Sequence, residues 1–276
     1  MTAHPVSRRF FVTGLGLFVT GIIAFPIYWL IVTSLRAPAD LQNTPSLLPV
    51  HIDASAYVAL LHQPELLHYL VNSAFYGICT TVLTVALGAS AAYALARLEL
   101  RGKTITLFGL LVLQTFPSIM LAIPLFVMFS RLHLIDSRMS VVVAITTKTL
   151  PFAILMLRPY FMTLPKDLEN AAAVDGCGRI STLVRVILPL SLPGIATVAA
   201  FNFLSGWGDL LFSLTLLTDE SKKPISLGLY KFMGVYGTDW NQLMAASVAA
   251  ALPALLVFAA SQRFLISGLA AGSTNE

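Results

Sequence analysis

The sequence predicts an all-α membrane protein with six transmembrane helices, and three observations support that fold class. Of the 276 residues, 57% are hydrophobic and 11% are charged, whereas about a quarter of the residues in a soluble domain are charged. Six apolar runs reach the roughly 20 residues that a helix needs to cross a bilayer. Lys and Arg are divided unevenly between the segments that join those runs, as in chains that cross a membrane several times.

The six apolar runs give the expected elements in order along the chain. The predicted spans are residues 10–35, 69–96, 105–130, 140–161, 190–217 and 243–266. The first run follows Arg8 and Arg9, as a signal peptide would, but it is too long for one, so we predict an uncleaved span. In the third run, Gln114, Pro117 and Pro124 are compatible with a kinked helix that faces a cavity.

Six spans place both termini on one side of the membrane, and the basic residues indicate which side. With a cytoplasmic N-terminus, the inside carries Arg8, Arg9, Arg97, Arg101, Lys103, Arg158, Lys166, Arg179, Arg185 and Arg263. The outside carries only Arg36, Arg131, Arg138, Lys222, Lys223 and Lys231. This bias predicts that both termini are cytoplasmic. The large external segments are then 36–68 and 218–242, and the long internal segment is 163–189.

Composition and residue spacing argue against several classes of function. A net charge of +4 without a basic run does not support nucleic-acid binding. The five histidines and two cysteines lack the spacing of metal ligands, so no metal site is predicted. The loops hold no catalytic constellation, and the two halves of the chain show no clear repeat, which weakens a secondary transporter. We expect no catalytic residue and no cofactor bound by this chain.

The internal segment is a polar, small-residue island between two apolar spans. Asp167 and Glu169 suit the first turn of a helix, because acidic residues stabilise the positive end of the helix dipole. The alanines 171–173 favour the same helix, and Gly176 provides a left-handed stop. A second, basic amphipathic stretch follows over 180–188. From these residues alone, the island is either a docking helix pair or an ordinary interfacial loop.

The island also carries a family resemblance. Its pattern, Asn170-Ala171-Ala172-x3-Gly176-x9-Val186-x-Leu188-Pro189, resembles the EAA loop of permease subunits in bacterial ABC importers, Glu-Ala-Ala-x3-Gly-x9-Ile-x-Leu-Pro. Asp175 before the glycine is also usual in that loop. Asn170 stands where the family has glutamate, and Glu169 lies one place earlier, about 100° away around a helix. Which of the two makes the family's polar contact is left open.

The resemblance extends to carbohydrate-type permeases, among them those of maltose and trehalose importers, through the six spans, Asn72-Ser73, and Trp207 followed by Asp209. It implies a type I ABC importer permease fold in the bacterial cytoplasmic (inner) membrane. It also implies half of a pathway for a sugar, with a disaccharide such as trehalose as the expected cargo. The implied partners are a second homologous permease, two ATP-binding subunits that use ATP and Mg, and an extracytoplasmic sugar-binding lipoprotein. The implied coupling residues are Glu169, Asn170, Ala171, Ala172, Asp175, Gly176 and Arg179.

Polar residues within the spans are candidates for the sugar pathway, because their exposure to lipid is costly. The candidates are Lys148, Asn202, Trp207 and Asp209. Lys148 and Asp209 alternatively form a structural ion pair, and Asp209 alternatively reaches the outer interface. Clustered cations would favour glycerol phosphate as cargo, but Lys148 stands alone, so a neutral sugar is preferred. Another oligosaccharide as cargo, and a stand-alone ion-coupled carrier, are the remaining alternatives.

The external segment 218–242 corresponds in position to the family's last periplasmic loop, which the resemblance implies touches the binding protein. Tyr230, Phe232 and Tyr236 are the predicted docking residues. Aromatic residues also anchor spans at the membrane interface, and that is the alternative interpretation.

Overall fold

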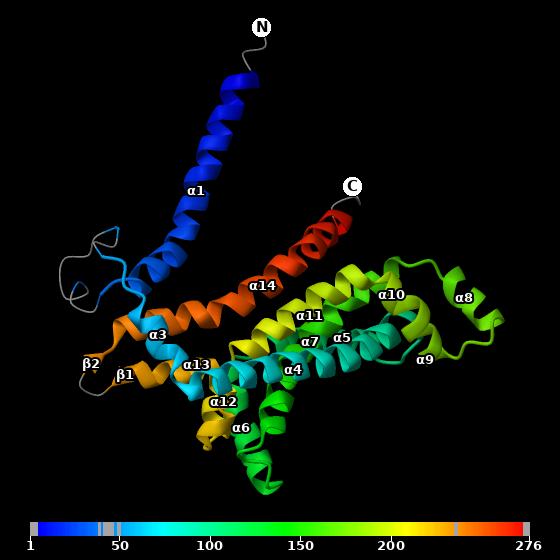
Figure 1. Cartoon of the computed structure of the whole chain (residues 1–276). Helices are drawn as coiled ribbons and strands as arrows, with labels where there is room; N and C mark the ends of the chain where they lie inside the picture. The colour runs from blue at the N-terminus through cyan, green and yellow to red at the C-terminus, as the bar shows by residue number, and fades with distance from the viewer. Residues whose placement is uncertain (1–4, 38–39, 41–46, 49–50, 235–236, 273–276) are drawn as a thin grey trace. The chain divides into compact units, whose positions relative to one another are not determined.

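The computed structural model describes residues 5–37, 40, 47–48, 51–234 and 237–272 and is built mainly of helices (Figure 1). In this part of the chain, four helices are long and apolar enough to cross a membrane, or six if each of two bent pairs forms one span. The predicted all-α membrane fold is confirmed. The apolar spans predict a single transmembrane permease domain over residues 1–276, and this stays a prediction. The structure divides into two compact units, Met1–Pro64 with Leu229–Ala251, and Glu65–Gly228 with Leu252–Glu276.

The first unit joins the end of the first helix to the start of the last. Its elements are α1 (Pro5–Ser34), α3 (Ser55–Leu61), η3 (Leu229–Phe232), strands β1 (Met233–Gly234) and β2 (Gly237–Thr238), and the first part of α14 (Trp240–Gly272). The strands pair antiparallel, with Met233 opposite Thr238. Asn241 Nδ2 donates to the carbonyl oxygens of Ser34, at 3.4 Å, and Arg36, at 2.5 Å. These bonds hold α1 and α14 together at one end.

The second unit holds the remaining helices. They are α4 (Pro64–Arg97), α5 (Lys103–Thr115), α6 (Ser118–Arg131), α7 (Arg138–Thr163), α8 (Asp167–Val174), α9 (Arg179–Thr182), the π-helical turn η1 (Leu183–Ile187), α10 (Leu188–Leu190), α11 (Leu192–Trp207), α12 (Leu211–Leu216), η2 (Glu220–Lys222) and α13 (Ile225–Gly228). In Figure 1, α4, α5, α7 and α11 run side by side, and α8–α10 lie at one end of them. A Cβ on Gly206 of α11 would lie 2.7 Å from the Tyr76 carbonyl oxygen of α4. The two helices therefore touch backbone to backbone.

The predicted span 105–130 is a bent helix pair and not a straight helix, and the predicted span 190–217 is divided into α11 and α12, with α11 forming a second bent pair with the segment before it. α5 and α6 meet at 100°. The bend occurs because a proline disfavours helical backbone in the residue before it, and Phe116, before Pro117, is extended with φ −69° and ψ 127°. The segment Arg179–Leu190 meets α11 at 88°. There Pro193, in the first turn of α11, has no N–H to continue the preceding helix.

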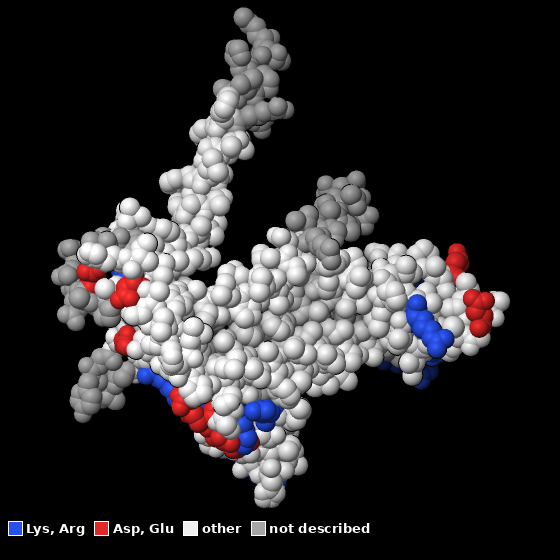
Figure 2. Space-filling model, viewed as in Figure 1, with Lys and Arg blue, Asp and Glu red and all other residues white. Residues whose placement is uncertain are grey.

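Charged side chains of the second unit gather at its two ends on the face shown in Figure 2. One end carries α8 and α9, and the other carries η2 with the turn that joins α6 to α7. The band between them shows almost no charge. An uncharged band between two polar ends is what a bilayer requires of the surface in contact with it.

Candidate coupling site

The predicted helix of the island is α8, and it ends as the sequence indicates. Asp167 and Glu169 lie in its first turn. At its end the N–H of Gly176 donates to the Ala173 carbonyl at 3.1 Å, and the N–H of Cys177 donates to the Ala172 carbonyl at 2.8 Å. Gly176 has φ +81°. This is the Schellman arrangement, in which a left-handed glycine satisfies the last carbonyls of a helix.

Most of α8 and its flanks is open to a partner. Asn170, Ala171, Asp175 and Gly176 are exposed, and Ala172 is buried on the inner side of the helix. Two large apolar side chains stand beside this small-residue face, Val174 at 88% exposure and Ile180, in α9, at 80%. Arg179, the first residue of α9, is also exposed. A short helix with a small-residue face and protruding apolar side chains suits insertion into a groove.

Glu169 is engaged inside the chain. Its Oε1 lies 2.5 Å from Nε of Arg97, the last residue of α4, as an ion pair without the alignment of a hydrogen bond. Tyr93 Oη donates to Glu169 Oε2 at 3.4 Å, and Arg97 Nη2 donates to the Leu164 carbonyl at 2.7 Å. The Arg97 side chain is only 6% exposed. Sequence reasoning missed this contact, although Arg97 was counted among the inside cations.

The four pathway candidates occupy different surroundings. Lys148 is exposed on α7 and lines a hollow. Asn202 is fully buried and donates from Nδ2 to the Val198 carbonyl at 2.8 Å. Trp207 is 6% exposed, and its ring stacks on that of Phe203 at 5.8 Å.

Asp209 holds the start of α12. Its Oδ2 accepts from Ser213 N at 2.8 Å and from Ser213 Oγ at 2.9 Å. Within the described part of the chain, no ion pair joins Asp209 to Lys148. Of the four candidates, Lys148 lines a hollow, Asn202 and Trp207 pack inside the protein, and Asp209 caps the start of α12. Their role in the pathway stays a prediction.

The predicted docking residues fall in the first unit. Tyr230 is 54% exposed in η3, and Phe232 is half-buried at the end of the same turn. Tyr236 lies outside the described residues.

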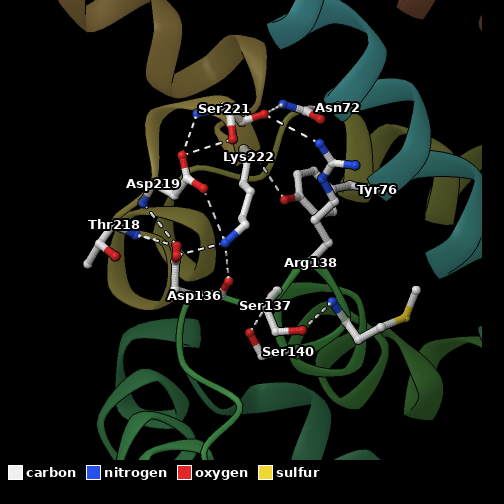
Figure 3. A network of polar contacts seen from close by, with 11 residues as sticks. Asn72, Tyr76, Asp136, Ser137, Arg138, Ser140, Thr218, Asp219, Ser221 and Lys222 are labelled. Atoms are coloured by element: carbon white, nitrogen blue, oxygen red, sulfur yellow. Dashed lines mark hydrogen bonds and ion pairs between the residues drawn. The ribbon is translucent and has the colours of Figure 1, made fainter.

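In the second unit, hydrogen bonds and an ion pair join residues 218–223 to the turn between α6 and α7 (Figure 3). Asp136 Oδ1 accepts from the N–H groups of Thr218 and Asp219, both at 2.9 Å, and Lys222 Nζ lies 2.8 Å from Asp136 Oδ2. The hydrogen bond that Lys222 donates holds the pKa of the Asp136 carboxyl well below its usual range, and the hydrogen bonds from the two backbone N–H groups act in the same direction. Asn72 Nδ2 donates to the carbonyls of Ser221 and Lys223 at 2.8 and 3.0 Å.

Sequence reasoning did not foresee this network, because its members come from three segments far apart in the chain. The one local signal is that Asp219 and Ser221 have the spacing of a capped turn, and Ser221 N does donate to Asp219 Oδ1 at 2.9 Å. No cluster of three or more His, Cys, Asp or Glu suitable for a metal occurs among the residues that the structure describes.

Membrane-crossing helices that present a short, capped helix at one charged end are the arrangement of a transporter permease. The family model described as "Binding-protein-dependent transport system inner membrane component" matches residues 84–269, and the chain belongs to this family. The resemblance to permease subunits of ABC importers is confirmed. A solved structure from a bacterial ABC transporter "involved in the import of the acidic polysaccharide alginate" superposes with a TM-score of 0.81, at 25% identity, over 95% of this chain and 99% of that one.

Curated relatives match along nearly the whole chain. The inner membrane ABC transporter permease protein YcjP of Escherichia coli (strain K12) is 33% identical over 98% of this chain and 97% of its own length. The sulfoquinovosyl glycerol permease SmoH of Agrobacterium fabrum is 33% identical over 95% and 92%. The trehalose/maltose permease MalG of Thermococcus litoralis is 34% identical over 91% of each chain.

Proposed function

We propose that this chain forms half of the pathway by which an ATP-driven importer carries a sugar across the bacterial cytoplasmic (inner) membrane, with both termini inside. The observation that carries the proposal is α8, an exposed small-residue helix closed by Gly176, in a chain of the permease family. Relatives named for sulfoquinovosyl glycerol and for trehalose/maltose support a glycoside cargo. Lys148 is the one charged residue among those that line the hollow, whereas a phosphate-bearing cargo would call for clustered cations. We therefore choose a neutral sugar, a disaccharide such as trehalose.

In this proposal, α8 sits in a groove of a partner ATPase, which binds ATP and Mg. Asn170, Ala171 and Val174 face that partner because they are exposed, while Glu169 is held by Arg97. Closure of two ATPase subunits on ATP draws α8 inward, and the ion pair pulls the end of α4 with it. Hydrolysis releases both. Rigid seating of a helix in a groove transmits such a motion, because packed elements move as bodies.

Membership of the permease family supports the remaining partners in this proposal. A second, homologous permease supplies the other half of the pathway. An extracytoplasmic sugar-binding lipoprotein delivers the cargo, and Tyr230, Phe232 and Tyr236 are the proposed docking residues on this chain.

Reconstitution tests the proposal directly. The chain is placed in proteoliposomes with a homologous permease, ATPase subunits and a sugar-binding protein from the same organism, and uptake of labelled trehalose and maltose is measured with and without internal ATP. We expect uptake that requires ATP and the binding protein. Uptake by this chain alone, driven by an ion gradient, would replace the proposal with a secondary carrier. ATP-dependent uptake of maltose and not trehalose would change only the sugar.

A further inference from the structure

The second unit contains a hollow of about 290 Å³ between α5, α7 and α11. Gln114 and Phe116 line it from α5 and the bend after it, Lys148 and Phe152 from α7, and Phe201 from α11. The rings of Phe152 and Phe201 lie 4.2 Å apart, so they form a joined aromatic surface. A mostly apolar hollow with a few polar groups is the usual form of a small-molecule site.

The residues that line the hollow fall near the middle of the predicted spans. α7 begins at Arg138 and α5 at Lys103. Lys148 and Gln114 therefore follow those starts by 148 − 138 = 10 and 114 − 103 = 11 residues. At about 1.5 Å per residue, each lies roughly 15 Å from its end of the span. That is about half of the 30 Å thickness of the hydrocarbon layer.

The bend between α5 and α6 occurs at the same depth. Phe116 and Pro117 lie outside the helices that they join, and Phe116 lines the hollow. Backbone that leaves a helix at membrane depth is tolerated only where protein covers it or where it borders a water-filled cavity. A break of this kind beside the hollow indicates that water or a polar guest enters it.

The donors in the hollow point to the chemistry of the guest. The hydroxyls of Thr147 and Thr149 donate hydrogen bonds to the carbonyls of Val143 and Ile145, at 2.8 and 3.1 Å. No carboxylate of the described residues lies within 4 Å of the Lys148 ammonium. Both Lys148 and Gln114 are exposed. Their ammonium and amide groups are therefore the donors presented to a guest.

We propose that this hollow is a sugar-binding subsite contributed by this chain. Phe152 and Phe201 pack against the apolar face of a sugar ring, while Lys148 and Gln114 donate hydrogen bonds to its hydroxyls. The volume is close to the lower end, about 300 Å³, of small-ligand pockets, so the subsite takes one or two sugar rings and not a long glycan. The inference rests on the proposed import function and deepens it, because it places sugar contacts on this permease as well as on its partner.

Cysteine protection in the complete importer tests occupancy. Cys79 and Cys177, the two free cysteines, are replaced by alanine, and Gln114→Cys is introduced. A small, charged thiol reagent should label this cysteine, and saturating trehalose should slow the labelling at least about fivefold, as expected for an occupied pocket. Phe108→Cys on α5, whose native side chain is 67% exposed and does not line the hollow, is the control and should show no sugar dependence. An unreactive Gln114→Cys would mean that the partner permease covers the hollow, and would overturn the subsite.

Transport kinetics give a second readout. Lys148→Met should raise the KM for trehalose uptake about tenfold, the usual consequence of losing a hydrogen bond from a charged donor. Lys148→Gln keeps a donor and should raise it less, whereas Val143→Met, at an exposed position of α7 outside the hollow, should leave KM unchanged. If the unmodified complex imports trehalose and Lys148→Met imports it with the same KM, the subsite is wrong and the import function stands. If the unmodified complex imports no sugar, both fail.

Discussion

Replacing Gly176 by valine is expected to uncouple ATP hydrolysis from transport, because it removes the conformation that closes α8. Gly176 has φ +81°, a backbone region that residues with a side chain rarely adopt. Its N–H and that of Cys177 donate to the carbonyls of Ala173 and Ala172 in the last turn of α8, before the chain turns towards α9. A turn that leaves this conformation redirects the exposed face that α8 offers to the ATPase.

The magnitude follows from the surroundings of Gly176. A Cβ there would meet no atom within 4 Å, so the cost of a side chain is backbone strain alone. That strain is about 1–2 kcal/mol, and a β-branched residue lies at its upper end. One to two kcal/mol shifts an equilibrium by a factor of roughly 5–30, so other turn conformations become populated at the expense of the native one.

Gly178 supplies the matched control. It also has no atom within 4 Å of its Cβ position, but its φ of −74° and ψ of 167° suit any residue. Both valine variants are reconstituted, and ATP hydrolysis and sugar uptake are measured in the same vesicles. We expect Gly176→Val to lower the sugar transported per ATP at least about fivefold, in line with the strain, and Gly178→Val to keep the normal ratio. Equal ratios in the two variants would refute the reasoning.

Three further changes probe other contacts. Reversing one charge, Arg97→Glu or Glu169→Arg, should reduce uptake severalfold, because each leaves a partly buried charge unpaired, and the double exchange should recover part of the loss. Asp136→Asn should lower the melting temperature of the complex at pH 7, and the difference from the unmodified complex should shrink as pH falls below about 4, the usual range of Asp. Gly206→Ala should destabilise by about 1–3 kcal/mol, since its Cβ would meet the backbone of α4, whereas Gly109→Ala, in open space, should not.

The sign of the pH effect follows from the direction of the pKa shift. A carboxyl whose pKa is depressed in the folded state stabilises the fold above its unfolded pKa, and loses that contribution as pH falls towards its folded pKa. A difference between Asp136→Asn and the unmodified complex that persists undiminished at pH 3 would contradict the assignment. If the variant with Arg97 and Glu169 exchanged transports no more sugar than either single variant, the attraction between the two charges is not what supports transport. A normal melting temperature for Gly206→Ala would mean that α4 and α11 separate without cost.

The sequence was sufficient for features that depend on local chemistry. The length of each apolar run predicts a span, and Pro117 predicts the break between α5 and α6. Gly176 marks the end of α8 because the left-handed region is where glycine differs most from other residues. These signals need only a few neighbouring residues, so no tertiary information is required to interpret them.

Contacts between distant segments could not be foreseen in the same way. Arg97 and Glu169 are ordinary charged residues near span ends, and only the packing of α8 against α4 brings them together. Asn202 resembled a pathway residue because it is polar in an apolar span. The structure buries it and directs its amide nitrogen to the Val198 carbonyl of its own helix, and its pathway role stays a prediction. Residue type alone does not distinguish these outcomes.

The arrangement gives the glutamate one place early in the motif a contact inside the chain. Arg97 binds Glu169 of α8 and, through Nη2, the carbonyl of Leu164, the residue that follows α7. Arg158 Nε of α7 donates to the Leu95 carbonyl of α4 at 3.4 Å. A displacement of α8 therefore acts on the ends of α4 and α7 together. α7 borders the hollow that Lys148 lines, so in the proposed assembly the Arg97–Glu169 ion pair links α8 to the helix that would contact the cargo. In the proposed assembly, the exposed amide of Asn170 is then the polar group offered to the ATPase, and a neutral contact there would be less sensitive to salt than a charged one.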